Sequence, residues 1–222
     1  MHCKKILYTA LAAGLLVLTG CASKHPLETP LGQSSFQEYL AETRAWIAEN
    51  RHFVMDDHEK ELTYHTPFEI RPAGKTDKGI LLIHGLGDSP WTYRDLATKL
   101  AEQGMLVRTV LLPGHGTKPA DMIGVTSEDW NKAVQEQIDL LKKEVPNVWL
   151  GGFSTGGNLA FSQAAEDPDI RGLILFSPAI EIRTKLVDLV PFADLFIDWL
   201  RKPDKNTEGV SPFKYGTIPL DG

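Results

Sequence analysis

Residues 148–157 read VWLGGFSTGG, and this stretch decides the fold. The apolar run 148–153 predicts a buried strand, and the small residues at 156–165 predict a closely packed helix. Residues 152–156 between them have the G-x-S-x-G pattern of a nucleophile elbow. On so sharp a turn the hydroxyl of Ser154 points away from the sheet, and the N-terminus of the next helix faces any negative charge that develops there. Ser154 is therefore the candidate catalytic nucleophile.

A second motif precedes the elbow in the chain. Residues 79–83 are an apolar run that predicts another buried strand, and His84-Gly85-Leu86-Gly87 follows it directly. An oxyanion hole needs two backbone N–H groups aimed at one point, one from the residue after the nucleophile and one from such an earlier loop. The candidate donors are therefore the backbone N–H groups of Thr155 and Leu86.

Strands and helices alternate through the middle of the chain. The pattern predicts further strands at 106–112 and 172–176 and further helices at 90–103 and 127–144. Such alternation with largely apolar strands indicates a parallel sheet covered by helices on both faces, the α/β class.

The regions on either side of this core are less regular. We expect a helix at 36–50, capped by Ser34 or Ser35, and a pair of strands within 61–71. Residues 183–201 have the spacing of an amphipathic helix or helix pair, which either completes the core or lines a pocket.

Three motifs together resemble one branch of the α/β-hydrolases. They are LLIHGLGDSP at 81–90, LPGHGT at 112–117 and GFSTGG at 152–157, and they resemble the carboxylesterase and monoacylglycerol lipase branch, whose motifs the serine aminopeptidase-like enzymes share. The resemblance covers residues 78–180. It implies that Ser154 attacks an acyl ester, that no metal or cofactor takes part, and that 183–222 is a helical cap segment.

The other polar residues of these motifs have structural explanations. We expect His84 to brace the oxyanion loop and His115 to hold the Pro-Gly-His-Gly turn. Asp88, Ser89 and Trp91 are expected to cap and begin the next helix.

The chain offers no histidine after the candidate nucleophile. A serine nucleophile needs a base and a group that orients it, and in this fold the order along the chain is Ser, then Asp or Glu, then His. All seven histidines precede Ser154: His2, His25, His52, His58, His65, His84 and His115. The sequence therefore predicts an incomplete α/β-hydrolase, lacking C-terminal strand–helix units and retaining little activity. A serine aminopeptidase-like hydrolase and a non-catalytic, lipid-anchored protein that binds an acyl ligand are the alternatives.

The N-terminus has the organisation of a bacterial lipoprotein signal. Lys4 and Lys5 precede an apolar stretch at 6–18 that is too short for a comfortable membrane span. Leu18-Thr19-Gly20-Cys21 resembles a lipobox, which implies cleavage before Cys21 and acylation of that cysteine. Ala22 favours retention at the outer rather than the inner membrane of the cell envelope.

These signals divide the chain into a signal peptide at 1–20, a tether at 21–34 and one hydrolase domain at 35–222. The net charge of −6 excludes a general affinity for nucleic acid, and no Cys/His cluster has metal-ligand spacing. The expected partners are a small acyl-ester or lipid substrate and a membrane, reached through the lipid anchor.

Overall fold

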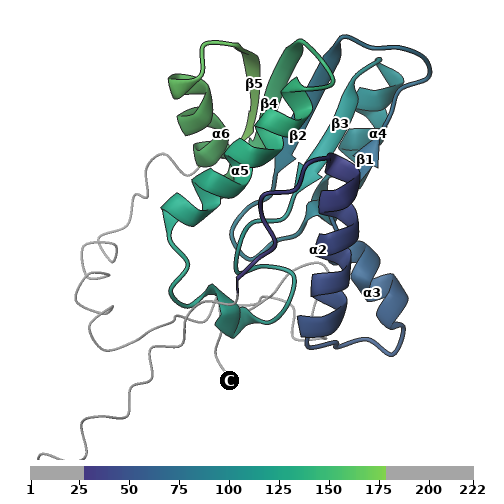
Figure 1. Cartoon of the computed structure of the whole chain (residues 1–222), viewed down its shortest axis with the longest axis vertical. Helices are drawn as coiled ribbons and strands as arrows, with labels where there is room; N and C mark the ends of the chain where they lie inside the picture. Colours follow the sequence, from purple (N-terminus) through teal and green to yellow (C-terminus); the bar gives the residue numbers. More distant parts are fainter. Residues whose placement is uncertain (1–27, 179–222) are drawn as a thin grey trace, which may run out of the picture.

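A five-stranded sheet forms the centre of the structure, a computed structural model that describes residues 28–178 (Figure 1). The strand order is β1-β3-β2-β4-β5. β2, β3, β4 and β5 pair in parallel, and only β1 runs antiparallel, against β3. The strands are β1 (Glu69–Ile70), β2 (Lys78–Ile83), β3 (Leu106–Val110), β4 (Asn147–Phe153) and β5 (Ile170–Phe176). The four parallel strands confirm the α/β prediction.

Helices cover both faces of this sheet. One apolar cluster packs α5 and α6 against one face, with α2 beside α5, and a second cluster packs α4 against the other face (Figure 1). The helices are α2 (Phe36–Asn50), α3 (His58–His65), α4 (Arg94–Glu102), α5 (Ser127–Lys142) and α6 (Thr155–Glu166), with 3-10 turns η1 (Pro90–Tyr93) and η2 (Pro119–Met122). The described chain is thus a three-layer α/β/α domain.

The strand register brings three loops to one edge of the sheet. Ile83, the last residue of β2, is paired with Val110 at the end of β3 and with Gly152 near the end of β4. The loops that follow these strands therefore begin side by side. The carboxyl edge of a parallel sheet is where α/β proteins bind ligands.

The prediction of a strand pair within 61–71 is wrong. Residues 58–65 form helix α3, whose first turn is capped by Asp57 through its side chain, and only 69–70 is a strand. Glu61, Leu62 and His65 are all buried and have helical spacing, but two of them are polar. The apolar pattern alone therefore did not reveal the helix.

The other expected elements are present with small shifts in their ends. Ser35 caps α2, one of the two residues expected to do so. α5 begins at Ser127, as expected, and its N-cap Thr126 forms a reciprocal capping box with Asp129. The helix expected at 90–103 begins as a 3-10 turn and becomes α-helical at Arg94.

A buried arginine ties the edge of the sheet to α5. The side chain of Arg108 on β3 is fully buried, forms ion pairs with Glu69 and Glu144, and lies over the ring of Phe36. Because an unpaired buried charge is costly, these two carboxylates keep β1, β3 and the turn after α5 together. Arg108 also donates to the carbonyl of Leu140 in α5.

Several expectations fall on residues outside the described range. They are the signal peptide, the first half of the tether (21–27) and the cap segment 183–222. Within residues 28–178 no helix is long and apolar enough to span a membrane, and no group of three or more potential metal ligands is present.

Candidate active site

Ser154 occupies a strained turn between β4 and α6. Its backbone has φ 52° and ψ −117°, a conformation that costs a residue other than glycine about 1–3 kcal/mol. The turn is held from both sides: Ser154 N–H donates to the carbonyl of Phe176 at 3.0 Å, and its own carbonyl accepts from Gly157 and Asn158 at 2.9 and 3.2 Å. Oγ of Ser154 has no hydrogen-bond partner among the described residues.

Two glycines allow the chain to double back at this turn. A Cβ atom on Gly152 would lie 2.1 Å from the carbonyl oxygen of Gly156. A Cβ atom on Gly156 would lie 2.0 Å from the carbonyl oxygen of Ile83 and 2.5 Å from that of His84. The start of α6 is therefore in backbone contact with the end of β2 and with the loop after it.

The loop after β2 lies against the elbow. A Cβ atom on Gly85 would come within 2.9 Å of the Phe153 ring. The N–H of Asp88 donates to the carbonyl of Gly85, and the N–H of Gly87 donates to His115. The N–H of Leu86 has no acceptor among the described residues. The same is true of the N–H of Thr155 at the start of α6.

Two buried histidines hold this loop and the loop after β3 together. The N–H of Leu112 donates to Nε2 of His84, and the N–H of Gly87 donates to Nε2 of His115, both at 3.1 Å. Each histidine thus accepts a hydrogen bond from the other's loop, and the two rings meet edge-on with centroids 4.8 Å apart. As expected from the sequence, both residues brace the loops. Their reciprocal arrangement was not predicted.

Both histidines are neutral, with the proton on Nδ1. Nδ1 of His84 lies 2.9 Å from the carbonyl of Gly85, and Nδ1 of His115 lies 3.1 Å from that of Pro113. A carbonyl can only accept and a backbone N–H can only donate, so Nε2 of each ring must be unprotonated. Burial lowers the pKa of His84 to about 4, and burial together with the neighbouring His84 lowers the pKa of His115 to about 3. Neither ring has a nitrogen left for Ser154.

The structure brings together three of the four residues expected at functional sites. Ser154, Thr155 and Leu86 lie on the two adjoining loops, whereas Cys21 is outside the described residues. A buried ion pair between Arg51 and Glu61, which contacts the loop after β3, was not predicted. No spacing or motif in the sequence connects these two residues with that loop.

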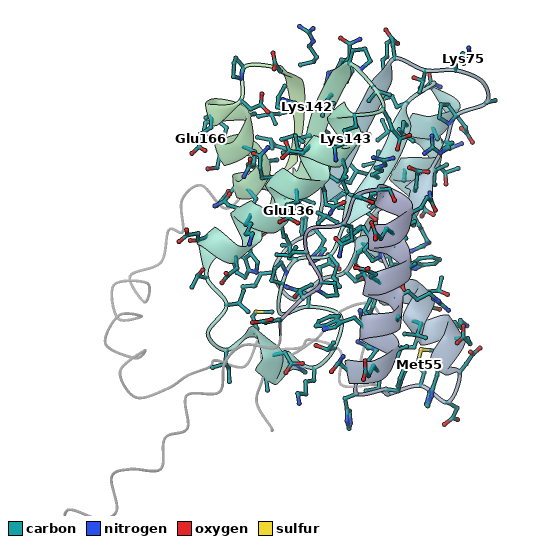
Figure 2. All side chains as sticks on the ribbon, in the orientation of Figure 1. Met55, Lys75, Glu136, Lys142, Lys143 and Glu166 are labelled. Carbon is teal, nitrogen blue, oxygen red and sulfur yellow. The ribbon has the colours of Figure 1, made fainter. Side chains whose placement is uncertain are left out.

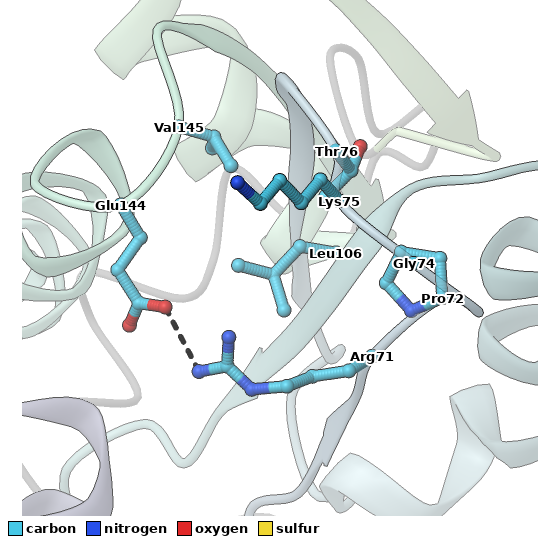
Figure 3. A pocket seen from close by; sticks show the side chains of 8 residues that line it. All are labelled: Arg71, Pro72, Gly74, Lys75, Thr76, Leu106, Glu144 and Val145. Carbon is cyan, nitrogen blue, oxygen red and sulfur yellow. Dashed lines mark hydrogen bonds and ion pairs between the residues drawn. The ribbon is translucent and has the colours of Figure 1, made fainter.

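A pocket of about 340 Å³ lies at the other end of the sheet. It is lined by Arg71, Thr76, Leu106 and Glu144 among others, and Figure 3 shows the ion pair of Arg71 with Glu144. Thr76 precedes β2 and Leu106 begins β3, so this pocket opens at the amino ends of the strands. Figure 2 shows Lys75, another lining residue, at that end of the molecule. The pocket is therefore separate from the elbow, which lies at the carboxyl end of β4.

The parallel sheet, the elbow and the adjoining glycine-rich loop define an α/β-hydrolase. The chain belongs to the family described as "Serine aminopeptidase, S33", whose model matches residues 74–209. This range begins after α2, α3 and β1.

Known proteins of two kinds resemble the chain. A thermostable monoacylglycerol lipase from Bacillus sp. (strain H-257) is 36% identical over 104 residues, 47% of this chain and 42% of the lipase. A carboxylesterase from Bacillus subtilis (strain 168) is 29% identical over 112 residues, 50% of this chain and 45% of the esterase. A solved structure from work on the metagenome-derived lipolytic enzymes LipS and LipT is 27% identical with a TM-score of 0.58, covering 69% of this chain and 62% of that one. The chain thus spans less than half the length of both curated relatives.

Proposed function

We propose that the chain is a serine hydrolase of the carboxylesterase and lipase type, with Ser154 as its nucleophile and acyl esters as its substrates. The observation that carries this proposal is the strained Ser154, whose hydroxyl, like two N–H groups on adjoining loops, has no hydrogen-bond partner among residues 28–178. Strained residues of this kind cluster at active sites, where the surrounding structure holds them in place. The monoacylglycerol lipase and the carboxylesterase that resemble the chain favour an ester over the amide bond that the family's name suggests.

In the proposed reaction, Oγ of Ser154 attacks the acyl carbonyl carbon and its proton passes to solvent water. The negative charge on the carbonyl oxygen is stabilised by the N–H groups of Leu86 and Thr155 and by the N-terminus of α6. The tetrahedral intermediate expels the alcohol, which takes up a proton, and leaves an acyl-serine. Attack by water on the acyl-serine then releases the carboxylic acid and restores Ser154.

We further propose that turnover by this chain is slow. A base next to the serine supplies much of the rate in such enzymes, and losing it lowers turnover by as much as about a millionfold. Among the described residues, the two histidines on the neighbouring loops, His84 and His115, already use both ring nitrogens for backbone groups, so neither is such a base.

Hydrolysis of chromogenic esters by the full chain tests the proposal. Short-chain and long-chain p-nitrophenyl esters are compared with an aminoacyl anilide, for the unaltered chain and for Ser154→Ala. We expect slow ester hydrolysis above the Ser154→Ala background, and no cleavage of the anilide. Equal rates in both proteins would contradict a catalytic Ser154, and preferential cleavage of the anilide would identify a peptidase.

We also propose that acylated Cys21 anchors the chain to the bacterial envelope, preferentially at the outer membrane. The support is the lipobox-like sequence at 18–21 with Ala22 after it. Several acyl chains anchor a protein stably, whereas one does so marginally. In fractionated cells the chain should sediment with membranes, and Cys21→Ser should shift it to the soluble fraction. Equal partitioning of the two proteins would contradict the anchor.

A further inference from the structure

The helices that precede the family match contact the loop after β3 at both of its ends. Near the start of the loop, Leu111 N–H donates to Oη of Tyr39 on α2 at 2.9 Å. Near its end, Arg51 at the C-terminus of α2 donates from a guanidinium nitrogen to the carbonyl of Gly116 at 2.8 Å and, more distantly, to that of Thr117 at 3.5 Å. His115, whose ring holds Gly87, lies between these contacts. α2 therefore fixes the segment that carries the brace of the oxyanion loop.

Arg51 is itself held rigidly by a buried carboxylate. Its side chain is 3% exposed and pairs with Glu61 of α3, which is fully buried, through two nitrogens at 2.5 and 2.7 Å. Glu61 also accepts the N–H groups of Val54 and Met55 in the turn between α2 and α3. Figure 2 shows Met55 at the opposite end of the molecule from Lys75. Two nitrogens of the Arg51 guanidinium bind Glu61, and the third donates to the carbonyl of Gly116.

The packing around Gly116 leaves its backbone little alternative position. Its φ of +86° is a left-handed conformation, and a Cβ atom there would lie 2.9 Å from the Leu111 side chain and 3.5 Å from that of Ile47 on α2. Ile47, Leu62 and Leu111 form one buried apolar cluster. A shift of Arg51 would therefore be transmitted to His115 rather than absorbed by loose packing.

We propose that Arg51, oriented by Glu61, is a positioning residue for the oxyanion loop. It acts in three steps: Arg51 fixes Gly116, the adjacent His115 is placed to accept from Gly87, and the direction of Leu86 N–H is set. This inference rests on the proposed function, because the direction of Leu86 N–H matters only if that group binds the oxyanion. It makes α2 and α3 part of the active-site structure, although they lie outside the range that defines the family.

The decisive variant replaces both charges, Arg51→Met together with Glu61→Met. Removing one partner alone would leave a buried charge unpaired and unfold the protein, whereas two apolar side chains of similar size can preserve the fold. The matched control is Arg44→Met with Glu59→Met, a pair that joins the same two helices at 2.5 Å but is largely exposed.

Two readouts are taken on the full chain: the rate constant for phosphonylation of Ser154 by a fluorophosphonate, and the amide resonance of Gly87 in ¹⁵N-glycine-labelled protein. The Arg51/Glu61 variant should be phosphonylated about tenfold more slowly or worse and should show a shifted Gly87 resonance, since small misplacements cost this much. The control should stay within about twofold and leave the resonance unchanged. An Arg51/Glu61 variant that is folded and matches the unaltered chain in both readouts would overturn the proposal.

Two further outcomes are informative. If the unaltered chain is not phosphonylated at all, the proposed function fails, and the Gly87 resonance alone decides whether Arg51 positions the loop. If the double variant does not fold, Arg51→Lys decides instead, because it keeps the charge opposite Glu61 but offers one nitrogen where three are used. Slower phosphonylation with a shifted Gly87 resonance then supports the proposal, and unchanged values overturn it.

Discussion

The backbone N–H of Gly87 donates to Nε2 of His115 across two loops that are 28 residues apart in the chain. This bond engages one N–H of the glycine-rich loop in holding the loop in place, and the N–H of the adjacent Leu86 is left without a partner among the described residues. An oxyanion donor must be fixed before the charge appears, because reorganisation during the reaction would reduce its benefit. The histidine is therefore best understood as a fixed acceptor and not as a base.

Substituting His115 with Gln and, separately, with Asn should distinguish its hydrogen bond to Gly87 from its hydrogen bond to Pro113. The Oε1 atom of Gln lies about where Nε2 lies and can still accept from Gly87, whereas Asn is too short to do so. We expect His115→Gln to be phosphonylated at Ser154 within about threefold of the unaltered rate. His115→Asn should react about tenfold more slowly and unfold about 1–3 kcal/mol more easily, because a buried N–H loses its acceptor. Equal rates for the two variants would show that the Gly87 bond has no role.

The stability of the domain should fall as the pH falls below about 6.5. The pKa of His84 is lowered to about 4 and that of His115 to about 3, so between 6.5 and these values the unfolded chain binds protons that the folded chain does not. The stabilisation is complete above pH 6.5 and is lost at roughly 1 kcal/mol per histidine per pH unit as the pH falls toward the folded-state values. Urea unfolding at pH 7 and pH 5 measures the difference.

The control for this pH dependence is His115→Gln, which removes one of the two titrating groups. Its loss of stability between pH 7 and pH 5 should be about half that of the unaltered chain. Carboxylates with lowered pKa values, such as those of Asp129 and Asp167, titrate below this window and do not obscure it. A flat stability profile between pH 5 and 7 would refute the neutral, buried histidine pair.

Gly156→Ala should disrupt the elbow. The added methyl group would lie 2.0 Å from the Ile83 carbonyl oxygen, a backbone atom that cannot move aside without displacing the end of β2. We expect a loss of about 1–3 kcal/mol in the free energy of unfolding, together with loss of phosphonylation. In the control, Gly172→Ala on β5, the methyl group would meet only the Trp149 side chain at 3.1 Å, and we expect a smaller effect. Similar stabilities for the two variants would contradict this packing.

Replacing the strained serine should reveal the cost of its conformation. At φ 52° glycine is relaxed and alanine is not, so Ser154→Gly should be more stable than Ser154→Ala by about 1 kcal/mol. The same pair of substitutions at Ser162, inside α6, should show the opposite order, because glycine weakens a helix interior. The same order at both positions, measured by thermal or urea unfolding, would argue against strain at the elbow.

The central part of the fold could be predicted from the sequence because its signals are local. Apolar runs predicted β2, β4 and β5, and the G-x-S-x-G pattern between β4 and α6 predicted the candidate nucleophile. Helix α3 was missed because its buried face carries Glu61 and His65, which hydrophobic periodicity does not count.

Contacts between distant segments could not be predicted in this way. The sequence indicated that His84 and His115 are structural, but their exchange of backbone partners depends on β2 and β3 being neighbours in register. The contact of Arg51 with Gly116 depends on how α2 packs against the loop after β3, and no motif encodes it. Single-sequence patterns describe elements and turns, whereas these bonds arise from the tertiary arrangement.

The most direct test of the account is to treat the full chain with a fluorophosphonate and to locate the adduct by peptide mass spectrometry. Fluorophosphonates phosphonylate a serine in an oxyanion hole, and the reaction is slow where no base lies next to the serine. The account therefore predicts a slowly forming phosphonyl group on Ser154, absent from Ser154→Ala. Ser89 and Ser177, on neighbouring segments at the same edge of the sheet, should remain unmodified. Absence of any adduct, or equal modification of Ser89 or Ser177, would contradict the assignment of Ser154 as the nucleophile.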